Sequence, residues 1–224
     1  MVLVKIINEV SDIFEEHGYK IYAVGGTVRD FLLEREIHDY DFVTDATPEE
    51  MKLFLDTYKD VFAKYGVMIY KHKGIKIEIT TLRKESSYND SRHPEKIKFV
   101  KHLKEDYLRR DFTINALYMD KNKKIYDFCD GLNDLKQKEI RVIGDIDKRM
   151  KEDPLRILRA LRFSLVLNFK LDDALDSYIQ NNIDLLNKLN PNKIREEIAK
   201  MQKINSVGTQ DILFKYGINL FNNH

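Results

Sequence analysis

The chain has 224 residues, of which 43% are hydrophobic and 33% are charged, a composition typical of a globular protein with one or two domains. No apolar run approaches the ~18 residues of a membrane span, so the pattern excludes an integral membrane protein built from helices. Cys129 is the single cysteine, which excludes an internal disulfide and a cysteine-cluster metal site and fits a cytoplasmic location.

The first third of the chain predicts a helix, a strand and a second helix. Apolar residues recur at helical spacing over residues 2–14, and Gly18 ends that helix. The apolar run Ile21–Val24 predicts a buried strand, after which Gly25 and Gly26 open the next helix. A strand, a glycine pair and a helix N-terminus present backbone N–H groups to an anion. Arg29, one turn further on, adds a guanidinium suited to phosphate.

Two aspartates follow on a segment that predicts a strand over residues 38–44. Asp39 and Asp41 are separated by one residue, so on a strand both carboxylates project from the same face. Two hard oxygen donors beside a phosphate-binding turn suggest Mg²⁺ and phosphoryl chemistry. Taken singly, each motif has a simpler interpretation, because a glycine pair is more often a turn and an Asp-x-Asp more often a solvated strand face.

Together, Gly25-Gly26-x-Val-Arg-Asp and Asp39-x-Asp41-Phe-x-Thr resemble the signature of the class II tRNA nucleotidyltransferase and bacterial poly(A) polymerase family. That family belongs to the DNA polymerase β-like nucleotidyltransferase superfamily. The resemblance implies an α/β (α+β) nucleotidyltransferase head at residues 1–145 and an all-helical neck at residues 146–224. It covers about residues 15–200 and does not include the family's helical body and tail, which grip tRNA. We expect a homo-oligomer to supply the tRNA contacts that the body and tail make in the family.

The next elements are a capped helix and a hairpin. Residues 47–50, Thr-Pro-Glu-Glu, combine an N-cap, a proline at N1 and a glutamate at N3, which predicts a helix to about Tyr58. Alternating side chains predict strands at Val67–Tyr70 and Gly74–Thr81. Glu78 lies between two isoleucines, and the pattern leaves open whether it faces solvent or shares the face of the two aspartates. The resemblance implies the second alternative, with Glu78 as a third catalytic carboxylate.

Residues 83–100 are polar and predict a long mobile loop, and such a loop in a compact domain is usually functional or disordered. The segment is similar to the flexible loop of family members that complete the whole CCA end. The resemblance assigns Asp90 and Arg92 to this loop, and their presence argues against an enzyme that adds CC alone.

Residues 106–117 mix strand and helix spacing and are assigned as a helix, whereas residues 124–145 predict short strands and turns. Arg109, Arg110 and Asp111 set two cations beside a carboxylate, an arrangement suited to a triphosphate and a ribose hydroxyl. The simpler interpretation is a surface ion-pair cluster that contributes ~0–1 kcal/mol. The wording Arg-Arg-Asp-Phe-Thr-x-Asn-Ala resembles a family motif, which implies that Arg110 and Asp111 bind the nucleotide.

From residue 147 the pattern predicts helices alone. The net charge of +1 indicates no nucleic-acid partner, but Lys148–Lys170 carries a local basic face that can neutralise phosphates. A solvated helix face is the open alternative. Four charged residues recur at every third position and are therefore neighbours on one helix. They are Asp153, Arg156, Arg159 and Arg162.

The start of this helix resembles the family's base-reading motif, Glu-Asp-x-x-Arg, in which Asp153 and Arg156 act as a protein template for the incoming base. A carboxylate accepts from an exocyclic amino group and a guanidinium donates to the neighbouring acceptor, which selects C and A over U. In the alternative interpretation, Asp153 merely caps a helix whose first residue is Pro154. Arg159 and Arg162 fit contacts with the triphosphate or the stacked base.

The resemblance implies an enzyme that transfers CMP and AMP from CTP and ATP to the 3′ end of tRNA, giving CCA and releasing pyrophosphate. Asp39 and Asp41 are implied to hold two Mg²⁺ ions, and Glu78 to assist the attacking hydroxyl. CC-only, A-only and poly(A) enzymes, acting on the 3′ ends of tRNA or other RNA, share these motifs. A non-catalytic RNA-binding relic is the alternative of another class, and the complete carboxylate set argues against it. The implied nucleotide-binding residues are Gly25, Gly26, Arg29, Arg110, Asp111, Asp153, Arg156, Arg159 and Arg162.

Overall fold

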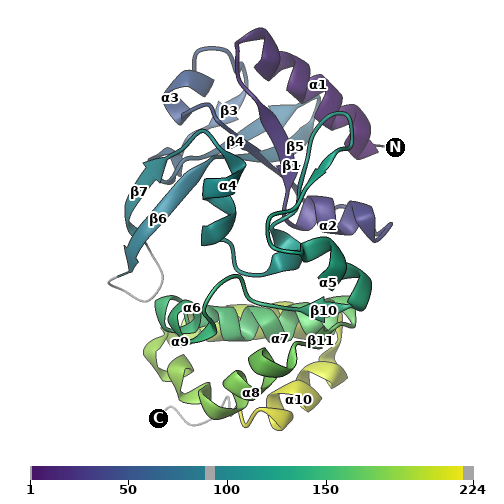
Figure 1. Ribbon diagram of the computed structural model, residues 1–224, viewed down its shortest axis with the longest axis vertical. Helices are drawn as coiled ribbons and strands as arrows, with labels where there is room; N and C mark the ends of the chain where they lie inside the picture. The colour runs from purple at the N-terminus through teal and green to yellow at the C-terminus, as the bar shows by residue number, and fades with distance from the viewer. Residues whose placement is uncertain (1, 89–93, 219–224) are drawn as a thin grey trace. The chain divides into compact units, whose positions relative to one another are not determined.

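The computed structural model describes residues 2–88 and 94–218, and these residues form two compact units (Figure 1). The first unit comprises the described residues up to Ser86 together with Lys96–Leu132. The second comprises the described residues from Asn133 onward together with residues 87–88 and 94–95. The sequence predicts functional domains that meet at residue 145, and that functional boundary stays a prediction.

The first unit is built on one mixed sheet. Within the described residues, seven strands form it in the order β3-β4-β5-β2-β1-β8-β9. Neighbouring strands pair antiparallel except β2 and β5, which are parallel. The strands are β1 (Ile21–Val24), β2 (Tyr40–Thr44), β3 (Tyr58–Lys59), β4 (Val67–His72), β5 (Ile75–Thr81), β8 (Tyr118–Met119) and β9 (Ile125–Tyr126).

Short helices and a separate hairpin complete this unit. The strands β6 (Arg83–Tyr88) and β7 (Pro94–Phe99) form a two-stranded sheet of their own. The helices are α1 (Val2–Glu16), α2 (Gly26–Leu32), α3 (Pro48–Met51) and α4 (Leu103–Asp106), with 3₁₀ helices at Ala63–Tyr65, Tyr107–Arg109 and Thr113–Asn115. The helix α5 (Gly131–Gln137) lies where the chain passes from the first unit to the second.

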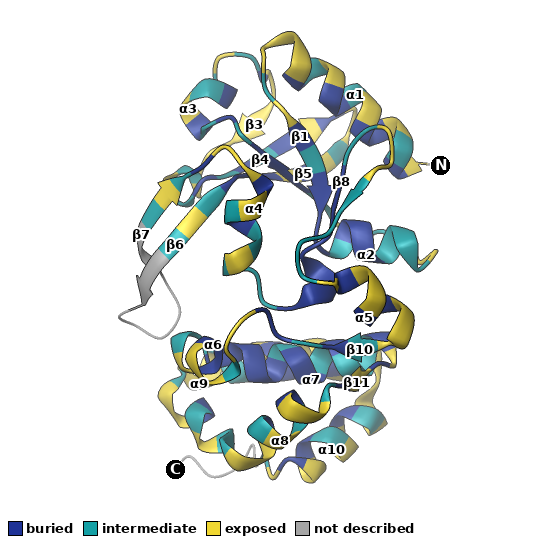
Figure 2. Cartoon of the chain, viewed as in Figure 1, coloured by how far each residue is buried: buried dark blue, intermediate teal, exposed yellow. Residues whose placement is uncertain are grey.

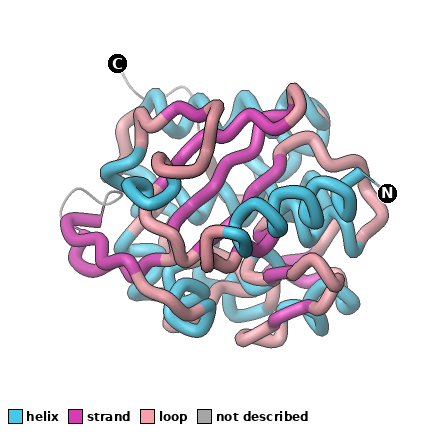
Figure 3. The backbone as a smooth tube through the Cα atoms, turned by 90° about the horizontal axis from the view of Figure 1, so that it is seen from above, coloured by secondary structure: helices cyan, strands magenta, loops and turns pink. Residues whose placement is uncertain are grey.

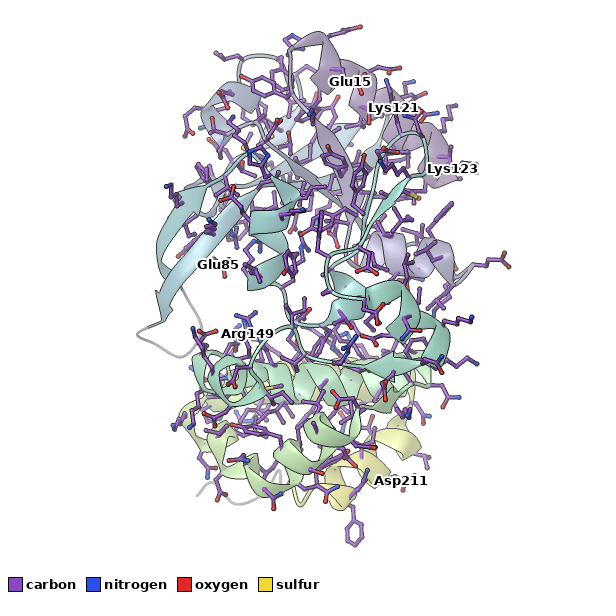
Figure 4. The ribbon with its side chains drawn as sticks, viewed as in Figure 1. Glu15, Glu85, Lys121, Lys123, Arg149 and Asp211 are labelled. Atoms are coloured by element: carbon purple, nitrogen blue, oxygen red, sulfur yellow. The ribbon has the colours of Figure 1, made fainter. Side chains whose placement is uncertain are left out.

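Helix α1 covers one face of the sheet, as the two views in Figures 1 and 3 show. Its buried residues recur at helical spacing, as the sequence predicts, and the side chains of Ile7, Val10 and Phe14 are completely buried. A salt bridge also connects α1 to the turn after β8: Lys121 Nζ lies 2.5 Å from Glu15 Oε2 (Figure 4). The opposite face of the sheet therefore remains for other groups.

Three predictions for the first unit are wrong in extent or kind. The helix that begins with the confirmed capping box at Thr47 ends at Met51 and does not reach Tyr58, because Phe54 packs its ring on α1 against Phe14, 5.0 Å away. The polar segment 83–100 contains the paired strands β6 and β7 where a loop is predicted. Residues 106–117 are predicted as one helix but form two short 3₁₀ turns. Ion pairs such as that of Arg109 with Asp106, rather than one apolar stripe, hold this segment in place.

The second unit is mostly helical, and most residues of its helix α7 are buried (Figure 2). The prediction of helices alone is wrong at one point: Lys170–Leu171 forms β11, which pairs parallel with β10 (Glu139–Ile140). Within the described residues, no helix is long and apolar enough to cross a membrane. The helices are α6 (Ile146–Glu152), α7 (Leu155–Leu167), α8 (Asp173–Asn181), α9 (Pro191–Ile204) and α10 (Ser206–Lys215), with a 3₁₀ helix at Ile183–Lys188.

Candidate active site

Three carboxylates meet on the face of the sheet opposite α1. Asp41 on β2 is the direct partner of Glu78 on the parallel strand β5, so the two side chains stand side by side on one face. Asp39 lies two residues before Asp41, directly before the first residue of β2. All three line one cavity of about 430 Å³, together with His38, Tyr40, Ile75 and Lys76. The register therefore places Glu78 on the face of the aspartates, the alternative that the pattern left open.

Ionisation of the carboxylates in this cluster is energetically unfavourable in the absence of a bound cation. Burial and the neighbouring charges of Glu78 and Asp39 raise the pKa of Asp41 from its ordinary 3.8 to about 6, against the opposing effect of Arg110 and Arg29. Like charges in a half-buried site disfavour ionisation, and a bound cation removes that penalty. The electrostatics therefore fit a site that becomes fully ionised when it holds a cation.

The donor set fits Mg²⁺ in kind. Carboxylate oxygens are the ligands that Mg²⁺ takes from proteins, usually one or two of them, the remainder coming from water and substrate phosphate. Among the residues that the structure describes, no three His, Cys, Asp or Glu side chains are grouped closely enough to form a complete metal site. The cavity thus brings together carboxylates of the kind that suits Mg²⁺, and Asp39 and Asp41 remain the predicted ligands.

A threonine fixes the position of both aspartates. Thr27, which is 1% exposed on the first turn of α2, donates its hydroxyl to the carbonyl oxygen of Asp39 at 3.0 Å. The same hydroxyl accepts from the backbone N–H of Asp41 at 2.8 Å. The helix start and the aspartate strand are therefore tied at one atom. Nothing in the sequence marks Thr27 as part of the site, because a threonine at a helix start carries no spacing signal.

Replacement of Thr27 by valine is expected to lower kcat for the nucleotidyl transfer that the sequence predicts about 10- to 100-fold, with a smaller change in KM for the nucleotide. Valine has the same shape but leaves the buried N–H of Asp41 without its partner, at a cost of ~1–3 kcal/mol. The serine variant keeps the hydroxyl and should retain most of the rate. Steady-state kinetics of both variants check this, and equal rates in the valine and serine variants would contradict a positioning role.

The predicted phosphate-binding turn is formed by Gly25, Gly26 and two arginines. Gly25 has φ +67°, a conformation that favours glycine, and α2 starts directly after it. A side chain at Gly25 would lie 3.9 Å from Nη1 of Arg110, and one at Gly26 would lie 3.5 Å from Nη2 of Arg29. Both guanidiniums therefore flank a turn that has no side chain to keep an anion away. This is the arrangement that the sequence predicts for phosphates.

Arg29 is held rigidly, because only 6% of it is exposed. Its Nη1 donates to Oδ1 of Asn115 at 2.7 Å, while Nε and Nη2 donate to the carboxylate of Asp30 at 2.9 Å. Asp111 is anchored nearby, since its Oδ1 accepts from the backbone N–H of Phe112 at 2.8 Å and from Asn115 at 3.4 Å. The amide of Asn115 thus links the predicted phosphate-binding and ribose-binding residues.

A second missed residue, Asp106, holds the Arg-Arg pair. Its carboxylate is fully buried and accepts from Nε of Arg109 at 2.8 Å, from Arg110 at 3.0–3.1 Å and from the hydroxyl of Tyr118 at 2.9 Å. Burial opposes ionisation of Asp106, but the two guanidiniums outweigh it and hold its pKa below the usual range. The spacing of three and four residues to the arginines is the sequence signal that could have found it.

In the second unit, Arg156 is buried at the start of α7. It is 5% exposed, and its Nη1 donates to the carbonyl oxygen of Arg149 at 2.7 Å. The carboxylate of Asp153 accepts from the backbone N–H of Leu155 at 3.1 Å, but the N-cap of α7 is Pro154 and the helix begins at Leu155, so the interpretation of Asp153 as the cap before a first helical Pro154 is wrong by one residue. This contact and base recognition are compatible roles for Asp153, because a carboxylate has several acceptor positions. A surface-charge interpretation of Arg156 is wrong, because the side chain is buried.

The two following arginines are half-buried on α7. Nε of Arg162 donates to Glu197 on α9 at 2.7 Å, and Lys200 donates to the other oxygen of that carboxylate at 2.7 Å. Burial would raise the pKa of Glu197, but the hydrogen bonds from Lys200 and Arg162 lower it overall. The guanidinium carbons of Arg159 and Arg162 lie 5.6 and 4.4 Å from the ring centroid of Phe163. Asp90 and Arg92 of the predicted loop lie outside the described residues.

Comparison with known proteins gives the context of these motifs. The family model for the poly A polymerase head domain matches residues 21–141. A CCA-adding enzyme of Lactobacillus helveticus is 46% identical over 187 residues, which cover 84% of this chain and 47% of that protein. One of Staphylococcus haemolyticus is 41% identical over 208 residues, covering 93% and 52%. The chain therefore spans about half the length of the curated relatives it matches.

Solved structures agree with the predicted fold class. The Bacillus stearothermophilus CCA-adding enzyme in complex with CTP superposes with a TM-score of 0.84 at 34% identity, covering 97% of this chain and 52% of that one. The Thermotoga maritima CCA-adding enzyme complexed with tRNA gives a TM-score of 0.74 at 25% identity, covering 96% and 50%. The mixed α/β head with a helical second unit is thereby confirmed. The chain belongs to the family of class II tRNA nucleotidyltransferases and poly(A) polymerases that the poly A polymerase head domain defines.

Proposed function

We propose that this chain carries the catalytic head and the base-reading neck of an enzyme that adds C, C and A to the 3′ end of tRNA. The observation that carries the proposal is the alignment of Asp41 with Glu78, beside a glycine turn flanked by Arg29 and Arg110. Carboxylates next to a phosphate-binding turn suit the transfer of a nucleotidyl group. The relatives named as CCA-adding enzymes supply the choice of substrate.

In the proposed reaction, the 3′ hydroxyl of the RNA gives up its proton to solvent, and its oxygen forms a bond to the α-phosphorus of CTP or ATP. The bond from that phosphorus to the bridging oxygen breaks, and pyrophosphate leaves. Asp39 and Asp41 would hold two Mg²⁺ ions, and such ions would supply the positive charge that acidifies a hydroxyl and stabilises a leaving phosphate. Glu78 faces the incoming hydroxyl. Arg29 and Arg110 bind the phosphates, since bidentate guanidiniums match phosphate oxygens.

Base choice is assigned to the second unit. Asp153 accepts from the amino group of cytosine or adenine, and Arg156 donates to the adjacent ring acceptor. Uracil has no such amino group and is rejected. Asp111 contacts the ribose, while Arg159 and Arg162 serve the triphosphate or the stacked base. The burial of Arg156 supports this role, because a fixed guanidinium loses little freedom when it binds a base.

The proposal is tested with transcribed tRNA that lacks its CCA end. CTP alone should give two additions, ATP alone should give none, and both together should give three. On tRNA that already ends in CC, ATP alone should give one addition. A long series of A residues on either RNA would indicate a poly(A) polymerase, and absence of product with any nucleotide would favour the RNA-binding relic.

Replacement of Arg156 by alanine is expected to reduce the preference for CTP over UTP about 10- to 100-fold, since a bidentate base contact is worth ~1–3 kcal/mol of discrimination. Arg195→Ala on the exposed surface of α9 is the matched control. The measurement is kcat/KM for both nucleotides on tRNA that awaits its first C. A loss of stability alone would lower both values together, so an unchanged ratio would remove Arg156 from base reading.

A further inference from the structure

Three lysines lie on the same face of the sheet as the carboxylates. On β5, Lys76 precedes Glu78 by two residues, and on β4, Lys71 is the direct antiparallel partner of Lys76. On the edge strand β3, Lys59 pairs with Ile69, which itself pairs with Glu78. Because paired residues share a face, all three lysines lie on the side of the sheet that α1 does not cover.

Burial along the strands agrees with this register. Met68, Tyr70 and His72 of β4 are buried, and Ile77 and Ile79 of β5 are completely buried, whereas all three lysines are exposed. The buried His72 confirms which face α1 covers, because its Nε2 lies 2.8 Å from the carboxylate of Glu9 on that helix. Along β3, β4 and the first half of β5, the lysine-bearing side of the sheet is therefore exposed to solvent.

The charges of these three lysines are also not neutralised by carboxylates. Among the described residues, none of Lys59, Lys71 and Lys76 forms an ion pair with a carboxylate. Neighbouring lysines do form such pairs: Lys52 with Asp60 at 2.7 Å, and Lys73 with Glu9 at 2.8 Å. Adjacent unpaired cations repel each other, and a polyanion laid across them relieves that repulsion.

The sheet order places these lysines on the opposite side of the aspartates from the phosphate-binding turn. Strand β2 has β1, which leads into Gly25 and Gly26, on one side, and β5, then β4, then β3, on the other. A triphosphate bound at the turn approaches Asp39 and Asp41 from the β1 side. The attacking RNA strand must then come from the β5 side, where Glu78 and the lysines lie.

We propose that Lys59, Lys71 and Lys76 form a phosphate-binding track for the RNA strand whose 3′ end is extended, an inference that rests on the proposed function. The track runs from β5 to the edge strand β3. Three strand spacings separate β2 from β3, or ~14 Å, which exceeds the ~3.4 Å rise of one stacked nucleotide. The lysines therefore contact phosphates behind the terminal nucleotide, and they bind any sequence there.

Salt dependence of RNA binding tests the track without catalysis. Each phosphate contact of a single strand contributes ~0.7 to the slope of log K against log salt concentration, so the triple variant K59Q/K71Q/K76Q should reduce that slope by ~2. The probe is tRNA without CCA, labelled for fluorescence anisotropy. The control K5Q/K20Q/K123Q removes the same charge from exposed lysines elsewhere in the unit, of which Lys123 is labelled in Figure 4. It should leave the slope unchanged.

Kinetics separate this proposal from the proposed function. The triple variant should raise KM for the RNA at least 10-fold, while kcat and KM for CTP stay within about twofold of wild type. Equal KM values for RNA in the triple variant and the control would overturn the track while leaving the enzyme assignment standing. A rise in KM for CTP instead would assign the lysines to the triphosphate and also overturn it. If wild type transfers nothing, the proposed function fails, and the salt slope still decides the track.

Discussion

Replacement of Asp41 by asparagine is expected to reduce nucleotidyl transfer at least ~10³-fold. The variant loses the charge that the proposed Mg²⁺ ions require, and metal stabilisation of a phosphoryl transition state is worth several kcal/mol. The same loss is expected for Asp39→Asn. Asp45→Asn, just beyond the end of β2 and outside the cavity, is the matched control and should keep near wild-type activity. Transfer by the double variant D39N/D41N at a tenth of the wild-type rate would contradict the assignment.

The same variant should not lose stability. Burial and the charges of Glu78 and Asp39 raise the pKa of Asp41 to about 6, so its ionised form costs the folded state free energy. That free-energy cost is absent when the pH is below 3.8, the ordinary pKa of an aspartate, and it grows as the pH rises to about 6. The asparagine variant should therefore be at least as stable as wild type at pH 7, without added metal. Thermal unfolding across pH 4–8 checks this, and a clear loss of stability at pH 7 would contradict it.

Replacement of Asp106 by alanine is expected to cost ~3–5 kcal/mol of unfolding free energy. The carboxylate is 0% exposed and compensates the guanidiniums of Arg109 and Arg110, and removal of one partner leaves buried charge uncompensated. Urea unfolding at pH 7 measures the loss. Glu105→Gln, which breaks the more solvent-accessible neighbouring pair with Lys84, is the control and should have a much smaller effect. Equal effects of the two variants would show that Asp106 is not the anchor.

The contribution of Asp106 also depends on pH. Burial would raise its pKa, but Arg109 and Arg110 lower it below its ordinary 3.8, so ionised Asp106 stabilises the fold. This contribution is fully present above about pH 4 and is lost as the pH falls through the lowered pKa. The stability difference between wild type and Asp106→Ala should accordingly shrink toward strong acid.

Local signals predicted the elements on which the site is built. The glycine pair after an apolar run, the Asp-x-Asp spacing and the alternation around Glu78 each act within a few residues. All three appear in the structure as β1 with the α2 start, β2, and β5. The capping box at Thr47 was likewise visible, because it needs only four residues.

The parts that could not be predicted depend on contacts between distant segments. The pair β10 and β11 joins residues about thirty apart through backbone hydrogen bonds, which leave no side-chain pattern. The face of Glu78 was undecided until the register of β2 and β5 was known. The spacing of Asp106 to Arg109 and Arg110 indicates an ion pair, but its complete burial could not be predicted, because it depends on the contact with the distant, buried Tyr118.

The proposed CCA addition is tested most directly by the length and sequence of the product that the wild-type chain forms with Mg²⁺, CTP and ATP on tRNA that lacks CCA. Three added nucleotides, CCA, are expected, with no addition when the metal is chelated and none by Asp41→Asn. Addition of A residues without limit, or transfer that continues without a divalent metal or without Asp41, would contradict it.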